Sequence, residues 1–106
     1  MKLRVEEQPD RNRYVVFADD RRAGFVTYRR EDGVIALDHT EVDEDFEGKG
    51  VGSALVRHVL DEARDAGVGV LPFCSFTRSY IERHPDYESL VPPEQRRRFG
   101  FGDQPS

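Results

Sequence analysis

Cysteine and long apolar runs are scarce in this chain of 106 residues. Cys74 is the only cysteine, so no disulfide can form within the chain. No run of apolar residues approaches the ~18 that would cross a membrane, and the N-terminus lacks an apolar signal region. We therefore expect a cytoplasmic protein that makes no contact with a membrane.

Basic charge is also in deficit, because 16 Lys and Arg residues stand against 21 Asp and Glu, and the net charge is −5. A general nucleic-acid binder needs a basic face that neutralises phosphates, so we expect no nucleic-acid partner. A single phosphate-rich ligand remains compatible with this charge, since a local group of backbone N–H donors can bind an anion. The three histidines and Cys74 show no zinc-ligand spacing, and we expect no metal.

The first half of the chain has the pattern of β-strands, with short β-prone segments separated by turns. Asp32 and Gly33 form a hairpin signal between two of these segments. The sequence therefore predicts an antiparallel meander of four strands. We expect these strands over residues 3–5, 14–17, 23–28 and 34–42.

The second half changes to a helical period. Val51, Leu55, Val59 and Ala63 recur every four residues, which predicts an amphipathic helix of about four turns. Gly67 is placed to end this helix. A buried strand and a second helix are expected next, over residues 68–71 and 75–83. Because a helix joins the fourth and fifth strands, we expect these two strands to be parallel neighbours.

The predicted fold class is α/β with a mixed sheet. Its order is an antiparallel four-stranded meander, a helix, a fifth strand and a second helix. The length allows one domain, which we place at residues 1–91. We expect residues 92–106 to form an irregular, mobile tail, because prolines, three consecutive arginines and a Gly-Phe-Gly run interrupt any period there.

Three glycines, Gly48, Gly50 and Gly52, alternate between the fourth strand and the long helix. Glycine permits positive φ and leaves the backbone accessible to a ligand. The first turn of a helix adds unpaired N–H groups and a partial positive charge. Together these features predict a site for a phosphate or pyrophosphate, to which Lys49 could add a cation and Ser53 a hydroxyl. The alternative is that the glycines only make a tight entry to the helix.

The segment Glu47-Gly48-Lys49-Gly50-Val51-Gly52 resembles the acetyl-CoA motif of GCN5-related N-acetyltransferases, Q/R-x-x-G-x-G/A. Its first position departs from the motif, because Glu47 stands where the family has Gln or Arg. Three further segments resemble a small acetyltransferase-like family, often labelled YjdJ-type, and the likeness covers residues 3–91. These segments are residues 39–42, residues 71–76, and residues 80–81 together with 83–87.

The resemblance implies the compact fold of the GCN5-related (GNAT) superfamily and acetyl transfer from acetyl-CoA to a primary amine of a small molecule or peptide. The backbone near Thr40 and Val42 would pair with the pantetheine arm and polarise the thioester carbonyl. Tyr80 could pack on the pantetheine or the adenine, and Arg83 could meet the 3′-phosphate, although each could equally serve packing or the surface. The pyrophosphate would lie on Gly48, Lys49, Gly50, Val51, Gly52 and Ser53.

His39 and Glu41 are the candidates for the base that deprotonates the amine. They have the same parity on an extended strand and should face the same side. Histidine changes charge near neutral pH without adjustment, whereas Glu41 would need a raised pKa or a relaying water. The alternative makes His39 a satisfied residue of the sheet and Glu41 a solvated one.

Cys74 lies just past the fifth strand, at the expected start of the second helix, where a helix N-terminus favours a thiolate. It could carry the acetyl group as a nucleophile or protonate the sulfur of CoA. Its other interpretation is a small buried hydrophobic residue. Direct transfer within a ternary complex needs no cysteine.

An acetyl-CoA-dependent N-acetyltransferase is therefore the leading hypothesis, as a monomer or weak homodimer. The acidic surface favours cationic amines through electrostatic steering. The main alternative is a non-catalytic acyl-CoA-binding module, because the helices that usually form a substrate wall after the first strand are missing. A third hypothesis is an interaction protein whose glycine loop is structural.

Overall fold

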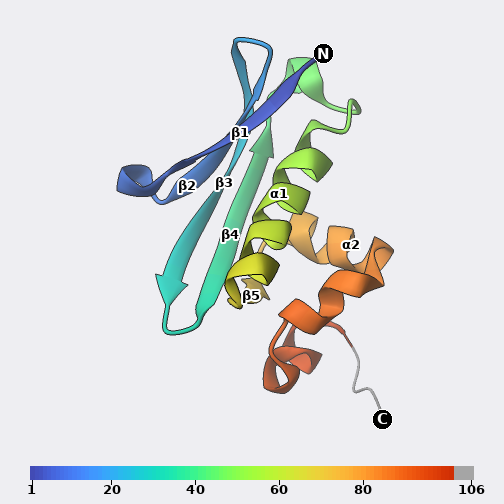
Figure 1. Ribbon diagram of the computed structural model, residues 1–106. Coiled ribbons are helices and arrows are strands. Elements are labelled where there is room, and N and C mark those ends of the chain that lie inside the picture. The colour runs from blue at the N-terminus through green and yellow to red at the C-terminus, as the bar shows by residue number, and fades with distance from the viewer. Residues whose placement is uncertain (102–106) are drawn as a thin grey trace.

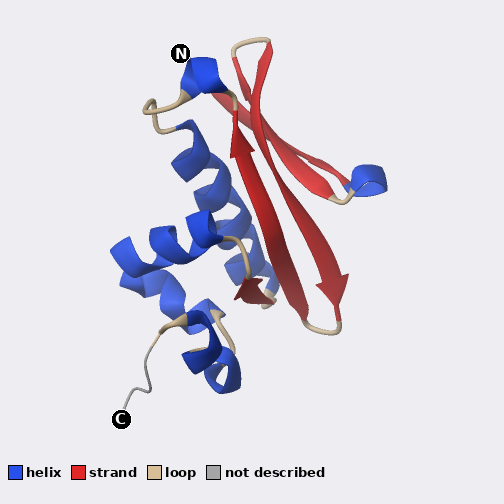
Figure 2. Ribbon diagram, turned by 180° about the vertical axis from the view of Figure 1, so that it is seen from behind, coloured by secondary structure: helices blue, strands red, loops and turns tan. Residues whose placement is uncertain are grey.

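The computed structural model describes residues 1–101 as a five-stranded sheet with one long helix, α1, against one face (Figure 1). This arrangement confirms the predicted α/β class. Figure 2 shows that α2 and the helical turns after it gather at the β5 edge, away from β1. The elements are β1 (Leu3–Gln8), β2 (Arg13–Ala18), β3 (Arg21–Glu31), β4 (Val34–Val42), α1 (Val51–Ala66), β5 (Gly69–Pro72) and α2 (Ser75–Arg83).

The strand order β1-β2-β3-β4-β5 follows the chain. The first four strands pair antiparallel and β4 pairs parallel with β5, so the predicted meander and the predicted parallel neighbours are confirmed. The bounds of β4 and α2 agree with the sequence prediction, and Gly67 ends α1 with φ 71°. β1, β2 and β3 extend beyond their predicted bounds, mostly by polar residues that a search for apolar β-prone segments leaves out. β5 starts and ends one residue later than predicted, at Gly69 and Pro72.

The pairing between β4 and β5 is short. It covers only Val34–Leu37 of β4, although β4 continues to Val42. On the other side of β4 the register shifts, so that Thr27 pairs with His39 and Tyr28 with Leu37, which leaves Asp38 as a bulge. A bulge bends its strand and increases the local twist. The second half of β4 therefore has no strand beside it on the β5 side within residues 1–101.

The core lies between α1 and the inner face of the sheet. Burying one Val, Leu or Ile side chain in this core stabilises the fold by about 1.5–3 kcal/mol, before the entropy of ordering is counted. The helix supplies the i, i+4 stripe predicted from the sequence, and β2, β3 and β4 supply alternate residues. The largest fully buried side chains include Leu55, Val59 and Leu60 of α1 and Val16, Val26, Ile35 and Leu37 of the sheet.

The C-terminal segment differs from the predicted irregular tail. Residues 93–95 and 97–99 form short 3-10 helices. Phe99 and Phe101 are buried in the core, and the ring of Phe99 meets that of Phe73 edge-on, with centroids 5.1 Å apart. The packed core therefore extends past residue 91, because Phe99 packs on Phe73, directly after β5, and Phe101 is buried in the same core. Residues 102–106 of the predicted tail lie outside the described residues.

A polar network joins the sheet to the C-terminal half of α1. Tyr28 Oη donates a hydrogen bond of 2.5 Å to Glu7, and Arg30 donates to Glu7 at 3.0 Å and to Tyr14 Oη at 3.1 Å. Tyr14 Oη donates in turn to Glu62. Partial burial raises the pKa of Glu7, but the hydrogen bonds from Tyr28 and Arg30 and the Arg30 charge outweigh it and hold that pKa below 4.5. Burial and the hydrogen bond to Glu7 raise the pKa of Tyr28 to about 12.

This network predicts how stability depends on pH. Glu7, with a depressed pKa in the folded state, stabilises the fold above pH 4.5, and the contribution is lost as pH falls through the folded pKa. Tyr28, with a raised pKa, stabilises the fold below pH 10, and the contribution is lost as pH rises towards 12. We expect Glu7→Gln to lower the free energy of unfolding at pH 7 by about 1 kcal/mol and to flatten its acid dependence, measured by urea unfolding. Glu6→Gln, on the opposite face of β1, is the control, and equal acid profiles for the two variants would contradict this role.

Candidate functional site

The loop before α1 is shaped by two of its three glycines. Gly48 and Gly50 have φ of 76° and 78°, in the left-handed region, and a Cβ at either would meet nothing within 4 Å. Gly52 serves another purpose, because a Cβ there would lie 2.6 Å from Cζ of Phe76 and 3.0 Å from Cγ2 of Val42. Two glycines therefore turn the chain into the helix, and the third admits an aromatic ring from α2.

The first turn of α1 presents unpartnered amides. The N–H groups of residues 50–53 find no acceptor within residues 1–101, and Gly50 at the N-cap has no side chain to cap them. Four such amides at a helix N-terminus carry the positive end of the helix dipole. The loop therefore has the donors that an anion such as a diphosphate requires.

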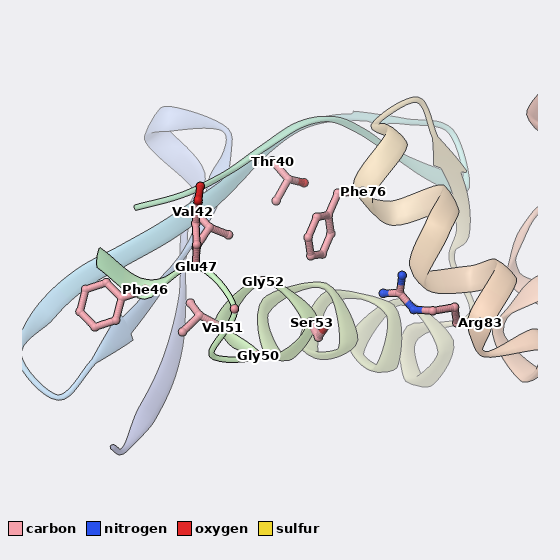
Figure 3. A pocket seen from close by; sticks show the side chains of 11 residues that line it. Thr40, Val42, Phe46, Glu47, Gly50, Val51, Gly52, Ser53, Phe76 and Arg83 are labelled. Carbon is pink, nitrogen blue, oxygen red and sulfur yellow. The ribbon is translucent and has the colours of Figure 1, made fainter. Parts of the chain in front are cut away.

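A cleft of about 460 Å³ opens beside these amides. In Figure 3 the side chains of Thr40, Phe76 and Arg83 come into it from β4 and α2. The structure thus brings most of the predicted cofactor-binding residues together around one space. The lining residues are Thr40, Val42, Phe46, Glu47, Gly48, Gly50, Val51, Gly52, Ser53, Phe76 and Arg83.

Two predicted cofactor residues do not line this cleft. Lys49 is exposed in the turn between the glycines. Tyr80 is buried, with 4% of its surface exposed, and borders a neighbouring groove instead. The sequence prediction had no assigned role for Phe46 or Phe76, because a phenylalanine next to a glycine loop or in an amphipathic helix usually indicates the core.

The edge of β4 beside the cleft presents backbone N–H and C=O groups that no strand pairs with in residues 1–101. The N–H of Asp43 donates to the carbonyl of Ala23 in β3 at 2.7 Å. Because successive residues of a strand present their backbone groups to alternate edges, those of Thr40 and Val42 point away from β3, towards the side where β5 has already ended. An extended ligand could add to this edge as a strand does.

Cys74 lies between the end of β5 and the start of α2. Its Sγ is 2.9 Å from Oγ1 of Thr40, and its N–H donates to the carbonyl of Leu37 at 2.9 Å. Cys74 is buried, with 6% of the residue's surface exposed. The only cysteine therefore contacts a residue that lines the cleft, at the point where β4 and β5 part.

His39 and Glu41 form a pair on the other face of β4. Nε2 of His39 is 3.0 Å from Oε2 of Glu41, both side chains are exposed, and the His39 ring meets Phe25 edge-on. The two residues face the same side, as the strand parity predicted. They alternate with Thr40 and Val42, however, so the candidate bases and the cleft lie on opposite faces of the sheet.

The model of one protein family, the GCN5-related N-acetyl-transferases, matches residues 13–90 of the chain. The chain belongs to this family. The match confirms the superfamily that the glycine motif indicated, and membership of the YjdJ-type group stays a prediction. No curated protein matches the chain.

Solved structures agree with this family. A GCN5-like protein from Staphylococcus aureus, itself only a proposed N-acetyltransferase, is 25% identical and has a TM-score of 0.66, covering 85% of this chain and 88% of its own. The ribosomal-protein-S18-alanine N-acetyltransferase of Escherichia coli is 25% identical, with a TM-score of 0.52 over 55% of this chain and 38% of its own. A ribosomal-protein-alanine N-acetyltransferase of Brucella melitensis biovar Abortus 2308, 23% identical with a TM-score of 0.50 over 76% of this chain and 61% of its own, shares the fold.

The family and the fold identify the chain as an acyltransferase of the GNAT type, with acetyl transfer as its general activity. GNAT enzymes generally take the acetyl group from acetyl-CoA, and the amides and the cleft described above fit the diphosphate of that cofactor. None of the helices within residues 1–101 combines the length and the apolar character that a membrane span requires.

The glycine loop allows a matched pair of variants. Gly50→Asp places a carboxylate at the unpartnered amides, and we expect it to raise the Kd for CoA by about tenfold or more, because it repels the diphosphate. Gly33→Asp is the control, since Gly33 has φ 74°, an equally open Cβ position and a place in the β3–β4 hairpin. Calorimetry compares the two variants. Equal affinities would show that the loop is only a turn.

Proposed function

We propose that this chain moves the acetyl group of acetyl-CoA to a primary amine. The observation that supports this best is that the unpartnered amides of residues 50–53 open into a cleft that reaches the unpaired edge of β4. A diphosphate and an extended pantetheine arm need these two features at neighbouring places. In this assignment the diphosphate binds the amides, and the pantetheine pairs with the backbone of Thr40 and Val42.

The thioester then lies where β4 and β5 part. There a backbone N–H of the open edge donates to the thioester carbonyl and stabilises the oxyanion that forms on attack. The nitrogen of the amine bonds to the carbonyl carbon, the carbon–sulfur bond breaks, and the amine loses a proton while the thiolate of CoA gains one. Each of these two protons needs a partner from the chain or from water.

His39 is the proposed acceptor of the amine's proton, with Glu41 orienting its ring through the 3.0 Å contact. This assignment has the amine approach from the outer face of the sheet, while the cofactor enters from the α1 face. The exposure of both side chains agrees with that approach, because the acceptor must reach them from solvent.

Cys74 is the proposed proton donor to the sulfur of CoA. Its Sγ contacts Oγ1 of Thr40, and no base is bonded to it within residues 1–101. A hydroxyl group cannot remove the proton of a thiol at neutral pH, so Cys74 is poorly placed to become a nucleophile. The geometry therefore favours direct transfer from the cofactor to the amine over an acetylated cysteine.

The function is tested by release of CoA from acetyl-CoA in the presence of different amines. The panel contains a polyamine, a lysine peptide and a peptide with an N-terminal alanine, the residue named for the Escherichia coli and Brucella enzymes. We expect release that depends on the amine and favours cationic acceptors, because the chain carries a net charge of −5. Binding of acetyl-CoA without release would indicate a non-catalytic acyl-CoA-binding module, and no binding would leave only a structural loop.

Cys74 has its own test. We expect Cys74→Ala to lower kcat roughly 10²-fold with little change in the KM for acetyl-CoA, because the proton is needed when the thiolate leaves and not for binding of the thioester. Cys74→Ser should recover only a small part of the rate, since a hydroxyl can donate a hydrogen bond to the leaving thiolate but is too weak an acid to protonate it. Mass spectrometry of the wild type should find no acetyl group on Cys74. An acetylated Cys74 would establish the nucleophilic route, and full activity in Cys74→Ala would make the thiol a packing residue.

A further inference from the structure

The strand β1 forms one edge of the sheet, and no strand pairs with its outer side within residues 1–101. It has six residues, its register with β2 runs from Leu3 to Gln8 without a shift, and it contains no proline. The other edge is protected, because β5 has four residues and ends at Pro72, and α2 and the turns after it gather there (Figure 2). Since proteins usually protect their edge strands by such means, the long and regular edge of β1 is open to another strand.

The backbone groups on the free side of β1 follow from its pairing with β2. The carbonyl of Lys2 accepts a hydrogen bond of 2.7 Å from the N–H of Asp19, so the backbone groups of Lys2 point to β2. Because these groups alternate along a strand, every second residue after Lys2 also points to β2. The N–H and C=O groups that point away from the sheet are therefore those of Leu3, Val5 and Glu7.

The side chains of β1 divide into a charged face and an apolar face. Arg4 and Glu6 form an ion pair on the face opposite α1, where both are about half exposed, and the Arg4 guanidinium lies 4.5 Å from the ring centroid of Phe17. Leu3 and Val5 are partly buried on the other face, where they border a groove of about 300 Å³ beside α1. A strand added to this edge would meet both faces.

The charges of β1 complement a second copy of the same strand in one register. When two copies run antiparallel with Val5 opposite Val5, Arg4 lies opposite Glu6 of the second copy, and the reverse pair forms by symmetry. The free backbone groups require that the register changes in steps of two residues. One step in one direction places Arg4 opposite Arg4, and one step in the other places Glu6 opposite Glu6. Because like charges directly opposite each other destabilise a strand pair, the register centred on Val5 is favoured.

We propose that β1 is the interface of a homodimer, in which two copies pair antiparallel with Val5 at the two-fold axis. The free backbone groups of Leu3 bond those of Glu7 in the second copy, those of Val5 bond their own counterparts, and the two sheets become continuous. Arg4 and Glu6 of both copies form a ring of alternating charge, and the two Val5 side chains meet beside the groove along α1. The inference is independent of the proposed function, since no residue of β1 borders the cleft.

The first test is the oligomeric state of the full chain. Strand pairing over six residues makes a small interface, so sedimentation equilibrium from about 10 µM to about 1 mM should show a weak and reversible dimer. Arg4→Glu and Glu6→Arg should each raise the dimer Kd about tenfold or more, because each places like charges opposite each other at two symmetric positions. The double variant, Arg4→Glu with Glu6→Arg, should restore the wild-type Kd. Arg22→Glu is the control, since it makes the same change in charge in β3, two strands from the edge.

Amide hydrogen exchange locates the interface without a variant. The N–H groups of Leu3, Val5 and Glu7 should exchange more slowly as the protein concentration rises, because only the dimer bonds them. The N–H groups of Arg4 and Glu6, which point to β2, should be protected at every concentration.

Two results would overturn the inference. A monomer at the highest concentration would exclude a second copy and leave the edge of β1 for a strand of another protein. A dimer that keeps its Kd in Arg4→Glu and Glu6→Arg, or that leaves the N–H groups of residues 3, 5 and 7 unprotected, would have its interface elsewhere on the chain.

Discussion

The early end of the pairing between β4 and β5 is the constraint on which the site depends. Pro72 closes β5 and has no N–H to donate, and Asp38 forms a bulge in β4 directly after the last paired residue, Leu37. The carbonyl of Leu37 accepts a hydrogen bond from the N–H of Cys74, which lies beyond the end of β5. The pairing of both strands therefore ends at Leu37 and Pro72, and the second half of β4 is an open edge beside the cleft.

α1 and α2 pack closely beside this open edge because Gly52 has no side chain. Gly52 in the first turn of α1 has no Cβ, and the ring of Phe76 from α2 fills the space that a side chain would need. This contact brings the N-terminus of α1, the start of α2 and the edge of β4 around one cleft. The glycine motif therefore has two physical purposes: Gly48 and Gly50 turn the backbone, and Gly52 allows the packing.

Electrostatics at the site is local and does not follow the net charge. The chain is acidic, yet the first turn of α1 and Arg83 border the same cleft. Most other arginines are engaged, for example Arg29 with Asp38 and Arg21 with Asp45. An anionic cofactor and a cationic acceptor are compatible on such a protein, because the cofactor meets the local positive groups and the acceptor meets the overall negative field.

The sequence by itself determined the strand order, the bounds of β4 and α2, the end of α1 at Gly67 and the glycine loop, because these depend on periodicity and on caps within a few residues. Only the tertiary structure decided where β4 and β5 part, and that His39 and Glu41 lie on the face opposite the cleft. It also decided the burial of Phe99 and Phe101 and the place of Arg83 at the cleft beside the first turn of α1. These features depend on register and on contacts between residues far apart in the chain, which no local pattern records.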